Sequence, residues 1–227
     1  MSSHLASIES ARIWAEGPPV EEVLAARPAR PVPLLAHNQA LAELAQALAC
    51  ADGDVLQQLV DRALVLCGAH SAGVSLIELD GTDKVFRWHA VAGRWSNYLM
   101  GSMPRNLSPC GIVVDRHAAQ VMPDPDLYFP AMRLAIPLAT EALLVPFDVL
   151  GETVGTVWVV SHEEGVRFAA DHLRVIESLA HFAAAAYLSQ VTLRRSLDDR
   201  AELLRMTTRL NRENERLREK LPEDESR

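Results

Sequence analysis

The sequence predicts an α+β fold, in which an antiparallel sheet is flanked by helices and a long C-terminal coiled-coil helix follows. Two pairs of short apolar runs are joined by the turn residues Asp80–Asp83 and Leu150–Glu152, which is the pattern of β-hairpins. Two leucine-rich stretches at helical spacing precede the first hairpin. Glycine and proline are absent from Val166 through Leu221, so this region can form one helix of about fifty residues.

These patterns place the elements along the chain. Asp54 precedes a helical pattern and is expected to cap it, because its carboxylate can accept the first free backbone N–H groups. We expect the following order: helix 34–50, helix 54–67, strands 73–79 and 85–91, an irregular insert 93–137, strands 142–149 and 153–161, and a helix from Phe168.

Composition indicates a soluble cytoplasmic protein. The chain has 227 residues, 49% of them hydrophobic, which is enough for a packed core. No apolar run approaches the roughly 20 residues of a membrane span, and no secretory signal is visible. The cysteines Cys50, Cys67 and Cys110 form no zinc or disulfide spacing, which suits a reducing compartment.

Charge and histidine spacing exclude further classes. The net charge of −8 argues against nucleic-acid binding through a large basic surface. The histidines show no HExxH or HxxxH spacing, so no metal site is predicted.

The chain ends differ in composition from the central region. Residues 1–33 contain five prolines and are expected to form a flexible or loosely docked arm. Residues 34–190 form the folded domain, residues 191–221 a dimerisation helix, and residues 222–227 a disordered tail.

The dimerisation helix carries a heptad pattern. With Leu193 at position a, leucine occupies three d positions and Asn214 a later a position, which is typical of a parallel two-stranded coil. Glu213 at g then faces Arg218 at e of the other chain. Polar residues at two a positions weaken the seam, and a solvated single helix is the alternative. We expect a homodimer formed through Leu193, Leu203, Leu210, Asn214 and Leu217.

The stretch from Val145 to Tyr187 resembles the closing half of a GAF domain, the sensory module of many signalling proteins. In that family a hairpin with a glycine pair like Gly151 and Gly155 leads into a final helix that carries the signal out. The resemblance covers about residues 34–190 and implies a GAF-like sheet whose insert binds a small molecule.

Four further segments resemble GAF input domains of bacterial sensor histidine kinases, which implies a role in two-component signalling with a downstream signalling protein. After Leu221 six residues remain, without a phosphoacceptor helix pair or an ATP-binding region, so we expect no kinase activity. The segments are residues 103–111, 114–116, 126–130 and 154–162.

Aromatic and charged residues of the insert region are candidates for a ligand pocket, since such sites combine apolar walls with a few polar groups. Each aromatic residue has core packing as its alternative, and each charged residue a surface role. The candidates are Trp88, Trp95, Tyr98, Arg105, Cys110, Asp115, Tyr128 and Phe129.

Cys110 has a chemical interpretation of its own. Ser108 as N-cap and Pro109 at the first turn predict a helix running towards Gln120. A cysteine at its start would have a lowered thiol pKa because of the helix dipole. A small buried cysteine is the alternative. The GAF photoreceptors that attach a bilin commonly carry histidine after the cysteine, and here Gly111 follows.

The sequence therefore favours a non-catalytic sensory module that binds a small molecule of unknown identity, with no cofactor assigned. The alternatives are a ligand-free dimeric scaffold, a bilin-binding photoreceptor, or a free methionine sulfoxide reductase using Cys110. The reductase needs a second thiol close by.

Overall fold

The computed structural model describes residues 18–50 and 54–220, with side chains as far as residue 217. The predictions for residues 1–17 of the arm and for the tail 222–227 lie outside these residues. The described elements are α2 (Val20–Ala25), α3 (Leu34–Cys50), α4 (Val55–Leu66), β1 (Ser71–Asp80), β2 (Asp83–Gly93), η1 (Ser96–Tyr98), β3 (Ser102–Pro104), η2 (Arg105–Leu107), α5 (Pro109–Arg116), β4 (Gln120–Pro123), η3 (Pro125–Leu127), η4 (Pro130–Leu134), β5 (Glu141–Val149), β6 (Glu152–Ser161) and α6 (Ala170–Lys220).

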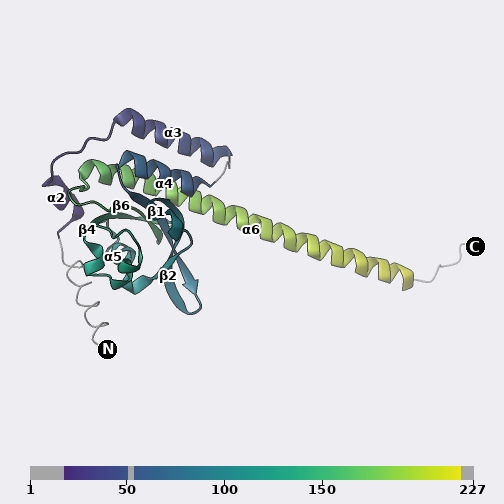
Figure 1. Cartoon of the computed structure of the whole chain (residues 1–227). Helices are drawn as coiled ribbons and strands as arrows, with labels where there is room; N and C mark the ends of the chain where they lie inside the picture. The colour runs from purple at the N-terminus through teal and green to yellow at the C-terminus, as the bar shows by residue number, and fades with distance from the viewer. Residues whose placement is uncertain (1–17, 51–53, 221–227) are drawn as a thin grey trace, which may run out of the picture. The chain divides into compact units, whose positions relative to one another are not determined.

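The strands form one six-stranded antiparallel sheet in the order β3-β2-β1-β6-β5-β4. Both predicted hairpins are present, and they meet through β1 and β6 in the middle of the sheet. Helices α3 and α4 and the first turns of α6 lie on one side of the sheet, and α5 lies on the other (Figure 1). The predicted α+β fold is confirmed.

The insert between the hairpins contains more regular structure than the sequence predicts. It contributes the edge strands β3 and β4 and the helix α5. Ser108 caps α5 as predicted, since its Oγ accepts a hydrogen bond from the Gly111 N–H at 3.3 Å. The predicted extension to Gln120 is wrong. His117 takes a left-handed conformation (φ 48°) that ends the helix, and Gln120 begins β4.

The described part of the arm, expected to be flexible or loosely docked, contacts the domain. Val20 and Leu24 of α2 are buried, and the Arg27 guanidinium lies 2.9 Å from the carboxylate of Glu141, which is fully buried at the start of β5. Arg27 also donates to the Phe168 carbonyl oxygen just before α6. Apolar burial and an ion pair therefore hold residues 18–33 on the domain, an arrangement that proline content alone does not reveal.

Helix α6 confirms the predicted long helix, with 51 continuous residues. The chain nevertheless divides into two compact units, residues 1–186 and 187–227. The α6 residues of the first unit bury one apolar face, which includes Leu173, Ile176 and Leu179. In the second unit the leucines of the helix are exposed to solvent.

Candidate functional site

The space between the sheet and the insert is occupied by a cluster of aromatic and sulfur-containing side chains. Trp88 comes from β2, Trp158 from β6, and Trp95 from the segment that follows β2. All three indoles are at least nine-tenths buried. This tryptophan cluster stands where the sequence predicts a ligand pocket, so its packing decides what the site can hold.

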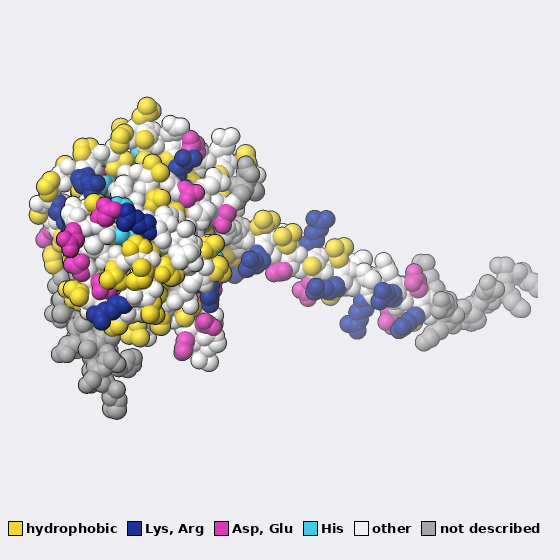
Figure 2. Space-filling view, viewed as in Figure 1, with side chains coloured by type: hydrophobic (Ala, Val, Ile, Leu, Met, Phe, Trp, Pro, Cys, Tyr) yellow, Lys and Arg dark blue, Asp and Glu magenta, His cyan; other side chains and the backbone are white. Residues whose placement is uncertain are grey.

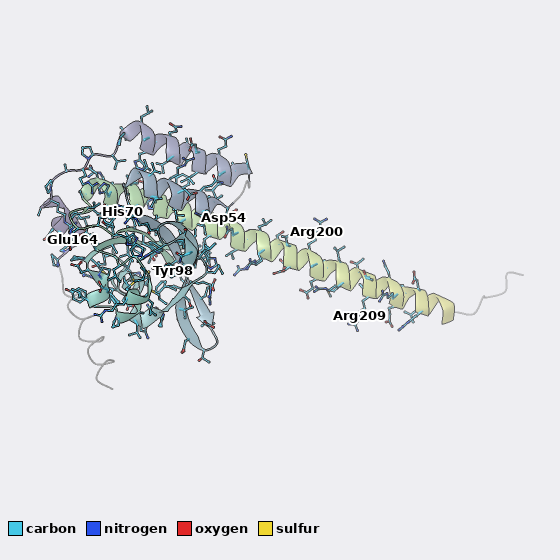
Figure 3. All side chains as sticks on the ribbon, in the orientation of Figure 1. Asp54, His70, Tyr98, Glu164, Arg200 and Arg209 are labelled. Atoms are coloured by element: carbon cyan, nitrogen blue, oxygen red, sulfur yellow. The ribbon has the colours of Figure 1, made fainter. Side chains whose placement is uncertain are left out.

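The three indoles contact one another directly. The ring centroids of Trp88 and Trp95 are 5.8 Å apart with planes 10° from parallel, a stacked arrangement. Trp158 lies 5.5 Å from Trp88 and 5.9 Å from Trp95 with tilted planes. Tyr98, labelled in Figure 3, meets Trp88 in an edge-on arrangement with ring centroids 6.1 Å apart. These separations are those of favourable aromatic pairs.

The polar atoms of the cluster are satisfied within the protein. The Trp95 indole N–H donates to the Pro137 carbonyl oxygen at 2.9 Å, and the Trp158 N–H donates to Ser75 Oγ at 2.8 Å. The Tyr98 hydroxyl accepts from the Ile136 N–H at 2.9 Å. Among the described residues, the one buried side-chain polar atom without a partner belongs to a histidine on α3, so the cluster offers no unpaired group to a ligand.

Gly73 on β1 provides the space that Trp158 fills. The two residues are paired across the β1–β6 ladder, and a Cβ at Gly73 would lie 2.2 Å from Cζ2 of the Trp158 ring. A glycine inside a strand marks a close approach of this kind. The local sequence of β1 therefore accommodates the indole inside the domain.

The cavity that remains beside the cluster measures about 20 Å³. That volume accommodates a single water molecule, whereas ligand sites typically measure about 300–1,000 Å³. Its walls are almost entirely apolar. They are formed by Trp88, Trp95, Met103, Pro109, Cys110, Met132, Ala142, Leu144, Trp158 and Val160.

Cys110 lies in this wall as the second residue of α5, and its surroundings favour a buried thiol over a thiolate. Burial raises the pKa of the Cys110 thiol, and hydrogen bonds with Thr156 and Ser75 offset the shift only in part. The Thr156 hydroxyl donates to Cys110 Sγ at 3.2 Å. Desolvation thus outweighs the helix dipole, and the alternative of a small buried cysteine is what the structure contains.

The other thiols do not change this picture. Cys67 is buried, and burial raises its thiol pKa to about 12, while Cys50 is exposed at the end of α3. The glycine that follows Cys110 also has a structural reason. A Cβ at Gly111 would lie 2.1 Å from the Arg105 carbonyl oxygen, so this turn admits no larger residue without rearrangement.

The predicted pocket residues separate into two groups. Trp88, Trp95 and Cys110 line the cavity, while Phe129 belongs to the same buried cluster. Tyr98 and Tyr128 pack against that cluster from outside and are partly buried.

Two charged candidates lie away from the cavity. Arg105 and Asp115 form an ion pair with a nitrogen–oxygen distance of 2.5 Å, and Asp115 is exposed to solvent. The pair joins the segment before α5 to the last turns of that helix. It has a surface role, which was the alternative for both residues.

The sequence prediction missed Trp158, Met103 and Met132 as wall residues. Trp158 was readable as an inward-facing strand residue, and its ladder partner Gly73 was the available signal of close packing. The two methionines carry no local signal, because their contacts are between segments far apart in sequence.

A histidine–serine pair lies at the edge of the cluster. The Ser71 hydroxyl is 2.7 Å from His162 Nε2, and His162 Nδ1 is 2.9 Å from the Leu138 carbonyl oxygen. Burial lowers the pKa of His162, so the neutral ring accepts from Ser71 and donates to Leu138. Ser71 is fully buried and also accepts the Trp95 backbone N–H. No substrate can reach this hydroxyl, so the pair is structural.

Neither a metal-binding cluster nor a membrane-spanning helix occurs in the part of the chain that the structure describes. No group of three or more His, Cys, Asp or Glu residues in residues 18–50 and 54–220 is arranged to hold a metal ion. Within the same ranges, none of the helices combines the length and the apolar character that crossing a membrane requires.

The comparisons agree with this architecture. Residues 53–187 match the family model described as GAF domain. The match spans more than half of the chain, and the chain belongs to the GAF domain family. No curated protein matches the sequence.

Solved structures show the same fold at low sequence identity. The phycocyanobilin-bound GAF domain of a cyanobacterial phytochrome has 11% identity and a TM-score of 0.57, covering 70% of this chain and 96% of that one. Free methionine-R-sulfoxide reductase from Neisseria meningitidis in complex with its substrate has 16% identity and a TM-score of 0.55, covering 69% and 91%. The GAF-B domain of DevS from Mycobacterium smegmatis has 20% identity and a TM-score of 0.50, covering 62% and 96%. These likenesses concern the fold.

Proposed function

We propose that the chain is a non-catalytic regulatory GAF module of the cytoplasm, which forms a parallel homodimer through α6 and acts on a signalling protein of the two-component type. One observation carries the proposal. The same helix supplies buried apolar side chains to the first unit and a row of exposed leucines to the second. A rearrangement of the domain core can therefore act, through this helix, on a surface that another chain can cover.

The exposed leucines support the dimer. Leu203, Leu210 and Leu217 are spaced seven residues apart and expose 65%, 62% and 53% of their surface. Covering a leucine side chain contributes about 1.5–3 kcal/mol, so a helix with this row is more stable when paired. Asn214 lies between the last two leucines and would favour a two-stranded coil in register.

The dimer is tested by light scattering on the full chain. We expect a mass of twice 25.0 kDa for the wild type and a monomer for Leu210→Asp. Thr208→Asp, on another side of the same helix, is the matched control and should remain dimeric. A monomeric wild type, or a Leu210→Asp variant that keeps the dimer mass, would refute this part of the proposal.

Such a module can be a ligand-free scaffold or a small-molecule sensor, and the size of the cavity supports the ligand-free scaffold. A cavity of about 20 Å³ with apolar walls and no unpaired polar group holds no metabolite, and the tryptophan cluster fills the space between the sheet and the insert. In this form, regulation comes from docking of a partner protein and not from a diffusible ligand.

Small-molecule sensing is the second candidate, and the composition of the wall favours it. Met103 and Met132 are adaptable side chains, and a ligand that displaced one indole would meet apolar surroundings. Such a ligand would have to bind the opened arrangement better than the closed one. Native mass spectrometry of protein from its own host, with a metabolite thermal-shift screen, separates the candidates. A bound mass that disappears in Trp158→Phe would establish sensing and refute the scaffold.

Catalysis by the thiols has little chemical support. Methionine sulfoxide reduction needs an attacking thiolate and a resolving thiol, and burial keeps both Cys67 and Cys110 protonated. We expect no turnover of free methionine sulfoxide with dithiothreitol as reductant. Turnover that is lost in Cys110→Ser would overturn the non-catalytic proposal.

A further inference from the structure

The second unit carries a basic face in addition to its leucines. Arg205, Arg209, Arg212 and Arg216 follow one another at intervals of four, three and four residues. At 3.6 residues per turn, these intervals place the four Cα atoms within about 60° of arc over about 16 Å of helix. Figure 2 shows several Lys and Arg side chains gathered along one side of the outer half of this helix.

The four arginines, here called the arginine face, have no ionic partner within the described part of the chain. None of them takes part in an ion pair or a side-chain hydrogen bond, although Glu213 lies at the margin of the same surface. Figure 3 shows the labelled Arg209 pointing into solvent. Arginines three and four residues apart repel one another, so an isolated helix gains nothing from this arrangement.

The arginine face and the leucine seam do not compete for the same surface. In the heptad that begins at Leu193, the four arginines occupy positions f and c, which lie on the outside of a two-stranded coil. The seam leucines occupy d. Pairing of two chains would therefore leave both arginine faces open to a third molecule.

We propose that the arginine face is a docking surface for an acidic helix of a partner protein. Guanidinium groups bind carboxylates through paired hydrogen bonds, and arginine is the residue best suited to such recognition. A partner helix with carboxylates at the same four, three and four spacing presents one acceptor to each arginine. This assignment extends the proposed function by giving the chemistry of the partner surface.

A nucleic-acid backbone is the competing polyanion, and two observations disfavour it. Residues 1–186 carry twelve basic and twenty-one acidic residues, so phosphate groups would be repelled by the larger part of the chain. In a parallel coil the two arginine faces also point away from each other, so they cannot both bind the same duplex.

The test measures fluorescence anisotropy of a labelled alanine-rich peptide with glutamates at the four, three and four spacing, titrated with the full chain. We expect binding that weakens with added salt and that is absent for the same peptide with glutamines. The double variant Arg209→Gln/Arg212→Gln should bind at least about tenfold more weakly. Glutamine keeps a high helix propensity, so the helix persists.

The matched control is Arg195→Gln/Arg200→Gln, which removes two charges from the same unit at positions that precede the arginine face along the helix. It should bind as the wild type does. Equal losses in both double variants, equal binding of the glutamine peptide, or no binding would overturn the proposal. Tighter binding of a duplex DNA of equal charge would assign the face to nucleic acid. Light scattering of each sample keeps this result separate from a failure of the dimer.

Discussion

The two parts of α6 show how one helix serves two environments. In the first unit Leu173, Ile176 and Leu179 expose at most 4% of their surface and complete the domain core. In the second unit Leu203 and Leu210 are more than half exposed. The first part is stabilised by contacts already made, and the second has apolar surface for contacts still to be made. Substitutions should therefore affect folding in the first unit and association in the second.

The largest expected effect is in the tryptophan cluster. Trp158→Ala removes an indole that packs against two others and donates to Ser75 Oγ. We expect the free energy of unfolding to fall by about 3–5 kcal/mol in urea titrations followed by circular dichroism. Leu203→Ala, the comparison in the second unit, should change the dimer dissociation constant and leave the unfolding of the domain nearly unchanged. Equal effects of the two variants on unfolding would contradict the distinction.

A somewhat smaller effect is expected at the buried carboxylate of Glu141. This group receives the Arg27 guanidinium and accepts the Phe168 N–H at 2.7 Å, so it joins the arm to the segment just before α6. Glu141→Gln should cost about 3 kcal/mol, because Arg27 loses its charge partner and is partly buried. The exposed Glu164→Gln should cost little. In limited proteolysis, a protease should also cleave near Arg27 sooner in the Glu141→Gln variant. An unchanged cleavage rate would show that the Arg27–Glu141 ion pair does not hold the arm on the domain.

The smallest effect concerns pH and His172 on the first turn of α6. Burial lowers the pKa of His172 to about 4, and its Nδ1 accepts the Ala169 N–H at 3.0 Å. Since the unfolded chain binds this proton near pH 6.5, stability is lost as pH falls from 6.5 towards 4. The loss from this residue is about 2 kcal/mol at pH 5 relative to pH 8.

His172→Gln should reduce the pH dependence of unfolding by this amount, while the exposed His181→Gln should retain it. Unfolding curves at both pH values provide the measurement. An unchanged slope in the first variant would show that His172 is not held neutral in the folded protein.

Much of the fold could be predicted because its signals are local. Turn residues mark both hairpins, Asp54 marks the start of α4, and the lack of glycine and proline marks α6. The end of α5 could not be predicted, since it depends on His117 adopting a left-handed conformation that glycine usually takes. The docking of α2 was also hidden, because Arg27 and Glu141 are more than a hundred residues apart.

The sequence predicted where the candidate site lies, but it did not predict that side chains fill the site or establish that the Cys110 thiol is buried. Trp88, Trp95 and Cys110 do line one cavity. Together with Trp158, however, their side chains fill most of the space, and the volume of a cavity cannot be read from residue types. The thiol of Cys110 shows the same limit. Its place at a helix start was visible in the sequence, whereas the burial that raises its pKa arises from distant strands.

The central claim, a parallel dimer formed in register through the leucine seam, is tested most directly by cysteine cross-linking. Asn214→Cys in a Cys50→Ser background places two thiols at facing a positions, within the Cα separation that a disulfide spans. Mild oxidation should give a covalent dimer of the full chain on a non-reducing gel, whereas Thr208→Cys on the outer surface should stay largely monomeric. A Thr208→Cys variant that cross-links as readily, or an Asn214→Cys variant that does not cross-link, would contradict the account.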